Sequence, residues 1–68
     1  MEDTRIFKLN KGDSFHFKTI ELSKKNKIVA GKRVWRFVET IGKNSYYTDG
    51  KKIFFTLWKR PCFKVQSE

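Results

Sequence analysis

The chain has 68 residues, of which 16 are Lys or Arg and 7 are Asp or Glu, so its formal net charge at pH 7 is +9. A chain of this length forms one domain, residues 1–68, and buries only about 60% of its unfolded surface. Its single cysteine and single histidine exclude an internal disulfide or a Cys/His metal site, and no cofactor is expected. The excess of positive charge favours nucleic acid or an acidic protein as the partner.

The sequence contains no segment that is typical of a membrane or an exported protein. No run of about 18 apolar residues is present, so no membrane-spanning segment is expected. The first five residues lack the basic-then-apolar order of a signal peptide. Together with the single thiol, this predicts a protein that is not secreted and that lies in the cytoplasm or is associated with a nucleoid or nucleus.

The predicted elements are short strands separated by turns. Residues 5–9 alternate and predict a first strand, and residues 10–13 predict a turn. Residues 14–22 predict a longer strand, whose apolar residues change phase midway, so a β-bulge is expected near Lys18 and Thr19. Then follow a basic loop over residues 23–27, a short apolar strand over 28–30, and, after Pro61, a last edge strand over 62–65. A helix over residues 19–30 is the weaker alternative, because its apolar spacing is poor.

Residues 34–58 organise the chain, since they hold seven of its eleven aromatic residues. Asp49-Gly50 predicts a two-residue type I′ turn, which places Thr48 opposite Lys51 and Tyr46 opposite Ile53. Because side chains alternate between faces, the hairpin has two sides. The predicted core side carries Tyr46, Ile53, Phe55 and Leu57. The predicted exposed side, both aromatic and basic, carries Tyr47, Lys52, Phe54, Thr56 and Trp58.

The strand over residues 34–41 joins this hairpin through a turn at Gly42-Lys43. A two-residue turn places Trp35, Phe37, Glu39 and Ile41 on the core side, with Val34, Arg36, Val38 and Thr40 on the other. A three-residue turn exchanges the two sets, because a slip of one residue moves every side chain to the other face. We favour the two-residue turn, since it buries the larger residues, and leave open which face of this strand is buried.

The pattern of short strands and frequent turns predicts an all-β protein. Five or six antiparallel strands are expected to form a small barrel or a strongly bent sheet. An SH3-like barrel is favoured over an OB-like one, because the chain is short for an OB domain.

The predicted exposed side suggests a nucleic-acid-binding surface. Bases stack on aromatic rings at about 1–3 kcal/mol each, and cations neutralise phosphates. One alternative is that these rings form a second buried face. Another is that they bind a protein partner, such as an acidic protein, and that this chain acts as its inhibitor or as an adaptor. An exposed edge strand could also pair with a partner's sheet. The predicted nucleic-acid-binding residues are Arg36, Lys52, Trp58, Arg60, Tyr47, Phe54, Lys24, Lys25, Lys32 and Arg33.

No catalytic constellation is visible, so the chain is not expected to be an enzyme. His16 lies between Phe15 and Phe17, and nothing in the sequence fixes a carboxylate near it. Cys62 is interpreted as a small buried filler.

Three stretches of the sequence resemble parts of nucleic-acid-binding families. Lys32-Arg33-Val34-Trp35-Arg36 resembles a strand of the small archaeal chromatin proteins, which are SH3-like and bind the DNA minor groove, although their C-terminal helix is absent. Residues 32–58 are similar to the three-stranded DNA-binding sheets of some tyrosine recombinases, again without the helix. Phe15-His16-Phe17 resembles half of the cold-shock RNA-binding signature. These resemblances show that residue chemistry of this kind is used for binding nucleic acid on this type of architecture.

Overall fold

The computed structural model describes residues 2–21 and 27–65, which form seven strands and one short 3-10 helix. The elements are β1 (Glu2–Arg5), η1 (Ile6–Lys8), β2 (Ser14–Glu21), β3 (Lys27–Ala30), β4 (Trp35–Ile41), β5 (Asn44–Thr48), β6 (Ile53–Leu57) and β7 (Pro61–Lys64).

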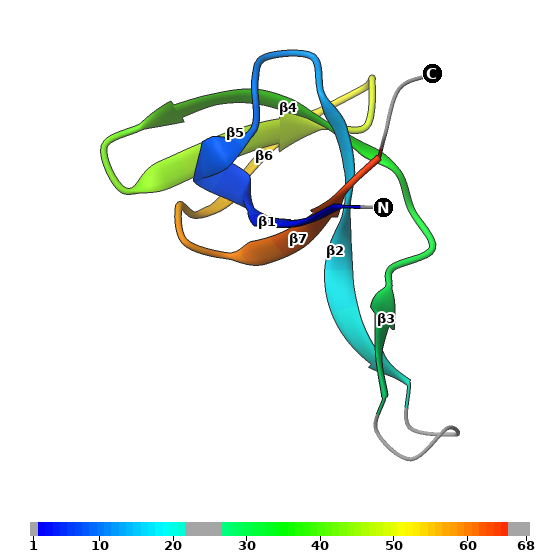
Figure 1. The fold of residues 1–68 in the computed structure, drawn as a ribbon. Helices are drawn as coiled ribbons and strands as arrows, with labels where there is room; N and C mark the ends of the chain where they lie inside the picture. The colour runs from blue at the N-terminus through cyan, green and yellow to red at the C-terminus, as the bar shows by residue number, and fades with distance from the viewer. Residues whose placement is uncertain (1, 22–26, 66–68) are drawn as a thin grey trace.

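All strand pairs are antiparallel, so the all-β prediction is confirmed (Figure 1). The strand order is β1-β7-β2-β4-β5-β6, and β3 pairs with β2 beside this path. The sheet is not closed into a barrel or strongly curled, and it has seven strands instead of five or six. Its two ends, β1 and β6, are both unpaired on one side in the described residues. Neither an SH3-like nor an OB-like order is shown.

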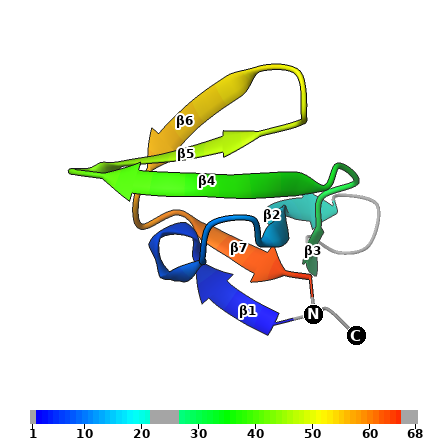
Figure 2. The ribbon, with the colours of Figure 1, turned by 90° about the horizontal axis from the view of Figure 1, so that it is seen from above.

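The sequence analysis predicted that the last strand is an edge strand, and this is wrong. β7 lies between β1 and β2 (Figure 2). Its central position buries Cys62 completely, which confirms that residue as a filler of the interior. Burial also raises the pKa of the Cys62 thiol to about 11, since the thiolate is poorly solvated there.

β2 changes partners along its length, because its first half pairs with β4 and β7 and its second half pairs with β3. Phe15 and Phe17 lie in the part that pairs with β7 and point into the core. From Lys18 onward the strand pairs with β3 in unbroken register, so the predicted bulge is not there. The β2–β3 hairpin projects from the rest of the sheet (Figure 1). The predicted basic loop is only partly visible, since Lys24 and Lys25 lie outside the described residues.

The prediction of a first strand over residues 5–9 is wrong. β1 ends at Arg5 and the chain turns into η1. A 3-10 helix has three residues per turn, so Ile6 and Leu9 lie on one side, and both are buried. The predicted turn over residues 10–13 is confirmed. There Gly12 has a φ of 90° and the Asp13 carboxylate accepts a hydrogen bond from the Asn10 N–H at 2.8 Å.

The β4–β5 hairpin has the predicted two-residue turn, with Ile41 opposite Asn44. The β5–β6 hairpin is different, because Thr48 lies opposite Ile53 and residues 49–52 form a four-residue loop. The predicted register was therefore wrong by two residues. An even shift leaves every side chain on its predicted face, so the division of the hairpin into two sides is correct.

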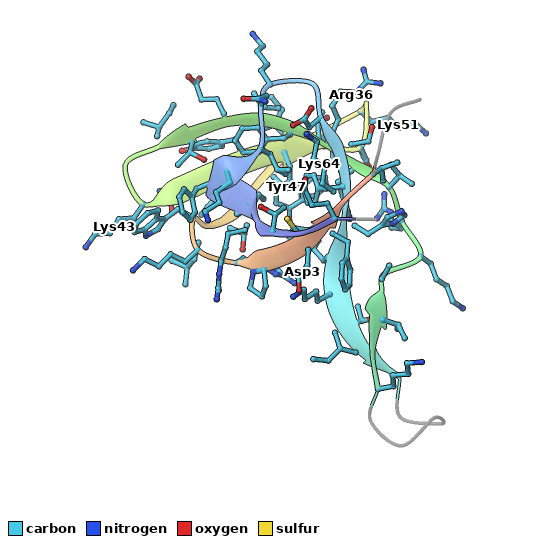
Figure 3. The ribbon with its side chains drawn as sticks, in the orientation of Figure 1. Asp3, Arg36, Lys43, Tyr47, Lys51 and Lys64 are labelled. Atoms are coloured by element: carbon cyan, nitrogen blue, oxygen red, sulfur yellow. The ribbon has the colours of Figure 1, made fainter. Side chains whose placement is uncertain are left out.

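What was wrong is which side is buried. Ile53, Phe55 and Leu57, predicted to form the core, are 66%, 66% and 69% exposed. Tyr47, predicted to be on the surface, is 8% exposed and lies in the interior in Figure 3. Phe54, also predicted to be exposed, packs against the core.

A β-bulge between Phe37 and Glu39 resolves the ambiguity over β4. Before the bulge, Trp35 and Phe37 face inward, as predicted, and Phe37 is only 4% exposed. After the bulge, Glu39 and Ile41 lie on the outer side, contrary to the prediction. The extra residue in β4 shifts the alternation of side chains by one position, which a sequence pattern of period two does not include.

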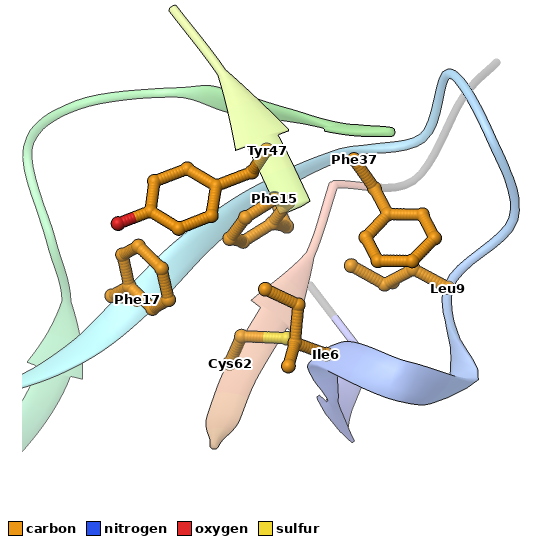
Figure 4. Packing of buried hydrophobic residues seen from close by; sticks show 7 residues of the cluster. All are labelled: Ile6, Leu9, Phe15, Phe17, Phe37, Tyr47 and Cys62. Carbon is orange, nitrogen blue, oxygen red and sulfur yellow. The ribbon is translucent and has the colours of Figure 1, made fainter. Parts of the chain in front are cut away.

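The core is enclosed by the inner faces of β4 and β5 together with η1, β2 and β7 (Figure 4). Aromatic edges meet aromatic faces there: Phe15 and Phe17 have ring centroids 5.1 Å apart, and Phe17 and Tyr47 are 5.0 Å apart. The polar residue Ser45 is also buried, and its hydroxyl lies at hydrogen-bond distance, 2.7 Å, from that of Thr40. The buried cluster consists of Ile6, Leu9, Phe15, Phe17, Phe37, Tyr47 and Cys62.

Candidate interaction surfaces

The predicted nucleic-acid-binding residues do not share one face. Arg36 at the start of β4 lies near the 49–52 loop, which contains Lys52; Arg36 and Lys51 both extend from this end in Figure 3. Trp58 follows β6 at the opposite end, where its N–H donates to the Lys43 C=O at 3.1 Å. Five residues of β6 separate the two ends by about 17 Å.

Several predicted residues are engaged within the protein. The Arg60 guanidinium lies over the Phe17 ring, 3.9 Å from its centroid. The Arg33 guanidinium lies 4.3 Å from the Trp35 ring centroid and pairs with Asp49 at 3.1 Å. Lys32 is exposed before β4. The buried Tyr47 ring cannot stack on a base, and Phe54 is held between Trp35 and Tyr47 at 5.4 and 5.7 Å.

The 49–52 loop is organised by the Asp49 carboxylate. Its Oδ1 accepts hydrogen bonds from the N–H groups of Lys51 at 2.8 Å and Lys52 at 3.0 Å. These backbone hydrogen bonds, first that of Lys52 and then that of Lys51, lower the pKa of Asp49 below its usual 3.8, and the Arg33 charge adds a smaller effect. The carboxylate therefore fixes the direction in which the chain enters β6.

Asp49→Ala is expected to destabilise the protein at neutral pH, because two loop N–H groups lose their acceptor. Since the folded pKa of Asp49 is lower than the unfolded value, the stabilisation is present above about pH 4 and is lost as the pH falls through the folded pKa. Urea unfolding at neutral pH and in acid measures this. The difference between the two proteins should shrink in acid, and a difference independent of pH would contradict the role of the carboxylate.

A basic corner surrounds the half-buried aromatic pair of Phe7 and Trp58, whose ring centroids are 5.0 Å apart. The Phe7 N–H donates to the Trp58 C=O at 3.1 Å, which ties η1 to the end of β6. Lys59 Nζ lies 4.8 Å from the Trp58 ring centroid, and Lys8 Nζ lies 5.9 Å from that of Phe7. With Lys43, these residues form the surface that we call the Trp58 corner.

An apolar surface, which the sequence analysis placed in the core, lies on the outside of β4–β6. We call Ile53, Phe55 and Leu57 the outer strip. Tyr46 from β5 packs beside it, with ring centroids of Tyr46 and Phe55 6.0 Å apart, and Ile41 of β4 is 57% exposed. Basic residues flank the strip in the sequence: Lys51 and Lys52 precede it, and Lys59 follows it.

Comparisons with protein-family models, curated proteins and solved structures gave no significant match. Within residues 2–21 and 27–65, no helix is long and apolar enough to cross a membrane. The same residues contain no group of three or more His, Cys, Asp or Glu side chains placed to hold a metal ion.

Proposed function

We propose that this protein is a protein-binding module whose outer strip docks on a partner. The observation that supports this proposal is the exposure of Ile53, Phe55 and Leu57, each about two-thirds open to solvent. Contiguous exposed apolar residues on a small soluble protein are typical of interaction sites. Full burial of such a side chain contributes about 1.5–3 kcal/mol, and most of that area is still available here.

The edge of the sheet supports the same proposal. Natural sheets protect exposed edges with a proline, a bulge or a charge within the strand. β6 has the sequence Ile-Phe-Phe-Thr-Leu, which contains none of these, and it is the last strand of the sheet path. An unprotected apolar edge strand favours association with another polypeptide.

Photo-crosslinking in cells that express the protein tests this proposal. A benzophenone amino acid at position 55, which is exposed, should give crosslinked species that are sensitive to protease and resistant to nuclease. The same amino acid at position 11, exposed in the turn before β2, provides the control. Equal crosslinking from both positions, or nuclease-sensitive products from position 55, would overturn the proposal.

A second candidate function, nucleic-acid binding, is favoured by the Trp58 corner. There an aromatic pair lies beside Lys8, Lys43 and Lys59, and phosphates bind such cations. This candidate is the weaker one, because Lys59 already lies over the Trp58 ring and a base would have to displace it.

Titration with a labelled single-stranded oligonucleotide at several salt concentrations tests this second candidate. Each phosphate contact contributes about 0.7 to the slope of log K against log salt for single strands. Lys59→Ala should therefore lower the slope, whereas Lys27→Ala, which removes the same charge from the β2–β3 hairpin, should not. Equal effects of the two changes would indicate only a general attraction by net charge.

A further inference from the structure

We infer that β6 accepts an extended segment of a protein partner as an additional antiparallel strand, and that this segment has an alternating apolar centre and acidic ends. This inference rests on the proposed function and specifies its partner. Three properties of β6 carry it: the phase of its backbone hydrogen bonds, the alternation of its side chains, and the charges at its ends.

The backbone phase shows which groups face the open edge. In an antiparallel ladder, residues alternate between pairs that exchange hydrogen bonds and pairs that do not. The bond from the Trp58 N–H to the Lys43 C=O is in register with β5–β6, so Thr56 and Phe54 also bond to β5. The N–H and C=O groups of Ile53, Phe55 and Leu57 therefore point away from β5.

Most of these groups are free to pair with a new strand. β6 ends the sheet path, so no neighbouring strand in the described part of the chain bonds to them. The Leu57 C=O is the exception, since it accepts a hydrogen bond from the Arg60 N–H at 3.2 Å. A partner strand would thus be held by both groups of Ile53 and Phe55 and by the Leu57 N–H.

The same three residues carry the outer strip, and this determines the sequence of the partner. Directly opposed residues in a sheet project to the same face. Partner residues opposite Ile53, Phe55 and Leu57 would therefore extend the apolar outer face, and should themselves be apolar. Those opposite Phe54 and Thr56 lie on the other face, which is half-buried.

The charges beside β6 favour an acidic segment as the partner over a second copy of this chain. β6 itself is uncharged, but Lys51, Lys52 and Lys59 flank it. If two copies paired through β6 with Phe55 opposite Phe55, the loop of one copy that carries Lys51 and Lys52 would lie at the same end of the new strand pair as Lys59 of the other, because these residues lie on either side of β6. Like charges brought close to one another repel, and the net charge of +9 adds to the repulsion. Acidic residues at these positions would be attracted instead.

The test uses an acetylated, amidated peptide, Glu-Glu-Val-Thr-Val-Thr-Val-Glu-Glu, titrated into the ¹⁵N-labelled protein. Centred on Phe55, it places valines opposite the outer strip and glutamates opposite the basic ends. We expect amide shifts at Ile53, Phe55 and Leu57, and slower hydrogen exchange of their N–H groups. Failure of this peptide to bind at millimolar concentration would overturn the inference.

Two N-methylated peptides separate strand addition from docking on the face. Methylation at the central valine removes an N–H that would bond to β6 and should weaken binding about tenfold or more. Methylation at a threonine removes an N–H that points away and should change the affinity less than about twofold. Equal binding of both peptides would overturn strand addition.

Two further controls separate this inference from the proposed function. A peptide with lysine in place of every glutamate should lose binding, and retained binding would overturn the acidic class of partner. Phe55→Ala should weaken binding of the unmodified peptide. If Phe55→Ala weakens binding while both methylated peptides bind equally, the outer strip still docks a protein, and only strand addition fails.

Discussion

Phe15→Ala is expected to abolish the native fold at room temperature. Phe15 is fully buried, with ring centroids 5.1 Å from Phe17 and 5.9 Å from Tyr47, so its removal leaves a cavity in the centre of the core. Replacing a buried Phe by Ala costs about 3–5 kcal/mol. A domain of 68 residues has a total free energy of unfolding of about 3–10 kcal/mol. The loss is therefore comparable to the whole stability.

Near-ultraviolet circular dichroism and amide shift dispersion measure this result. The Phe15→Ala spectrum should show poor dispersion and weak aromatic signals. Phe15→Leu fills much of the same space and should fold with a lower urea midpoint. A well-dispersed Phe15→Ala spectrum with an unchanged midpoint would show that Phe15 does not organise the core.

Replacing Phe54 by alanine should lower the stability of the protein much more than replacing its neighbour Phe55. Phe54 packs against Trp35 and Tyr47, so Phe54→Ala should cost about 3 kcal/mol, at the lower end of the range because the ring is only partly buried. Phe55 is 66% exposed on the outer face, and Phe55→Ala should change the stability by less than about 0.5 kcal/mol.

The comparison is internally controlled, because both changes remove the same ring from neighbouring positions of one strand. Urea unfolding of the two variants gives the two free energies directly. Equal losses would show that the outer strip is buried in solution, either within the chain or in an oligomer. A larger loss for Phe55→Ala than for Phe54→Ala would reverse the assignment of the two faces.

Both sides of the hairpin carry large apolar residues, and this is why the sequence could not assign the two faces. Alternation identifies which residues share a face, but not which face meets the rest of the chain. The decision came from Phe15 and Phe17 of β2, whose rings pack against Tyr47.

The bulge in β4 and the position of β7 were also decided by tertiary structure. The bulge lets Trp35 and Phe37 face the core while the two-residue turn at Gly42-Lys43 is kept. A regular strand satisfies only one of these conditions. β7 lies between β1 and β2, where Cys62 is buried, and strand order depends on contacts between segments far apart in the chain.

The sequence by itself determined the all-β class, the antiparallel pairing, the turns at residues 10–13 and 42–43, the sharing of faces within the hairpin, and the positive charge. These features depend on local dihedral preferences, on alternation with period two, and on composition. Only the tertiary structure decided the open sheet, the bulge, the strand order and the exposure of the outer strip. Each of these depends on which surfaces are buried against one another, and two apolar faces of similar size give no local signal of which will be covered.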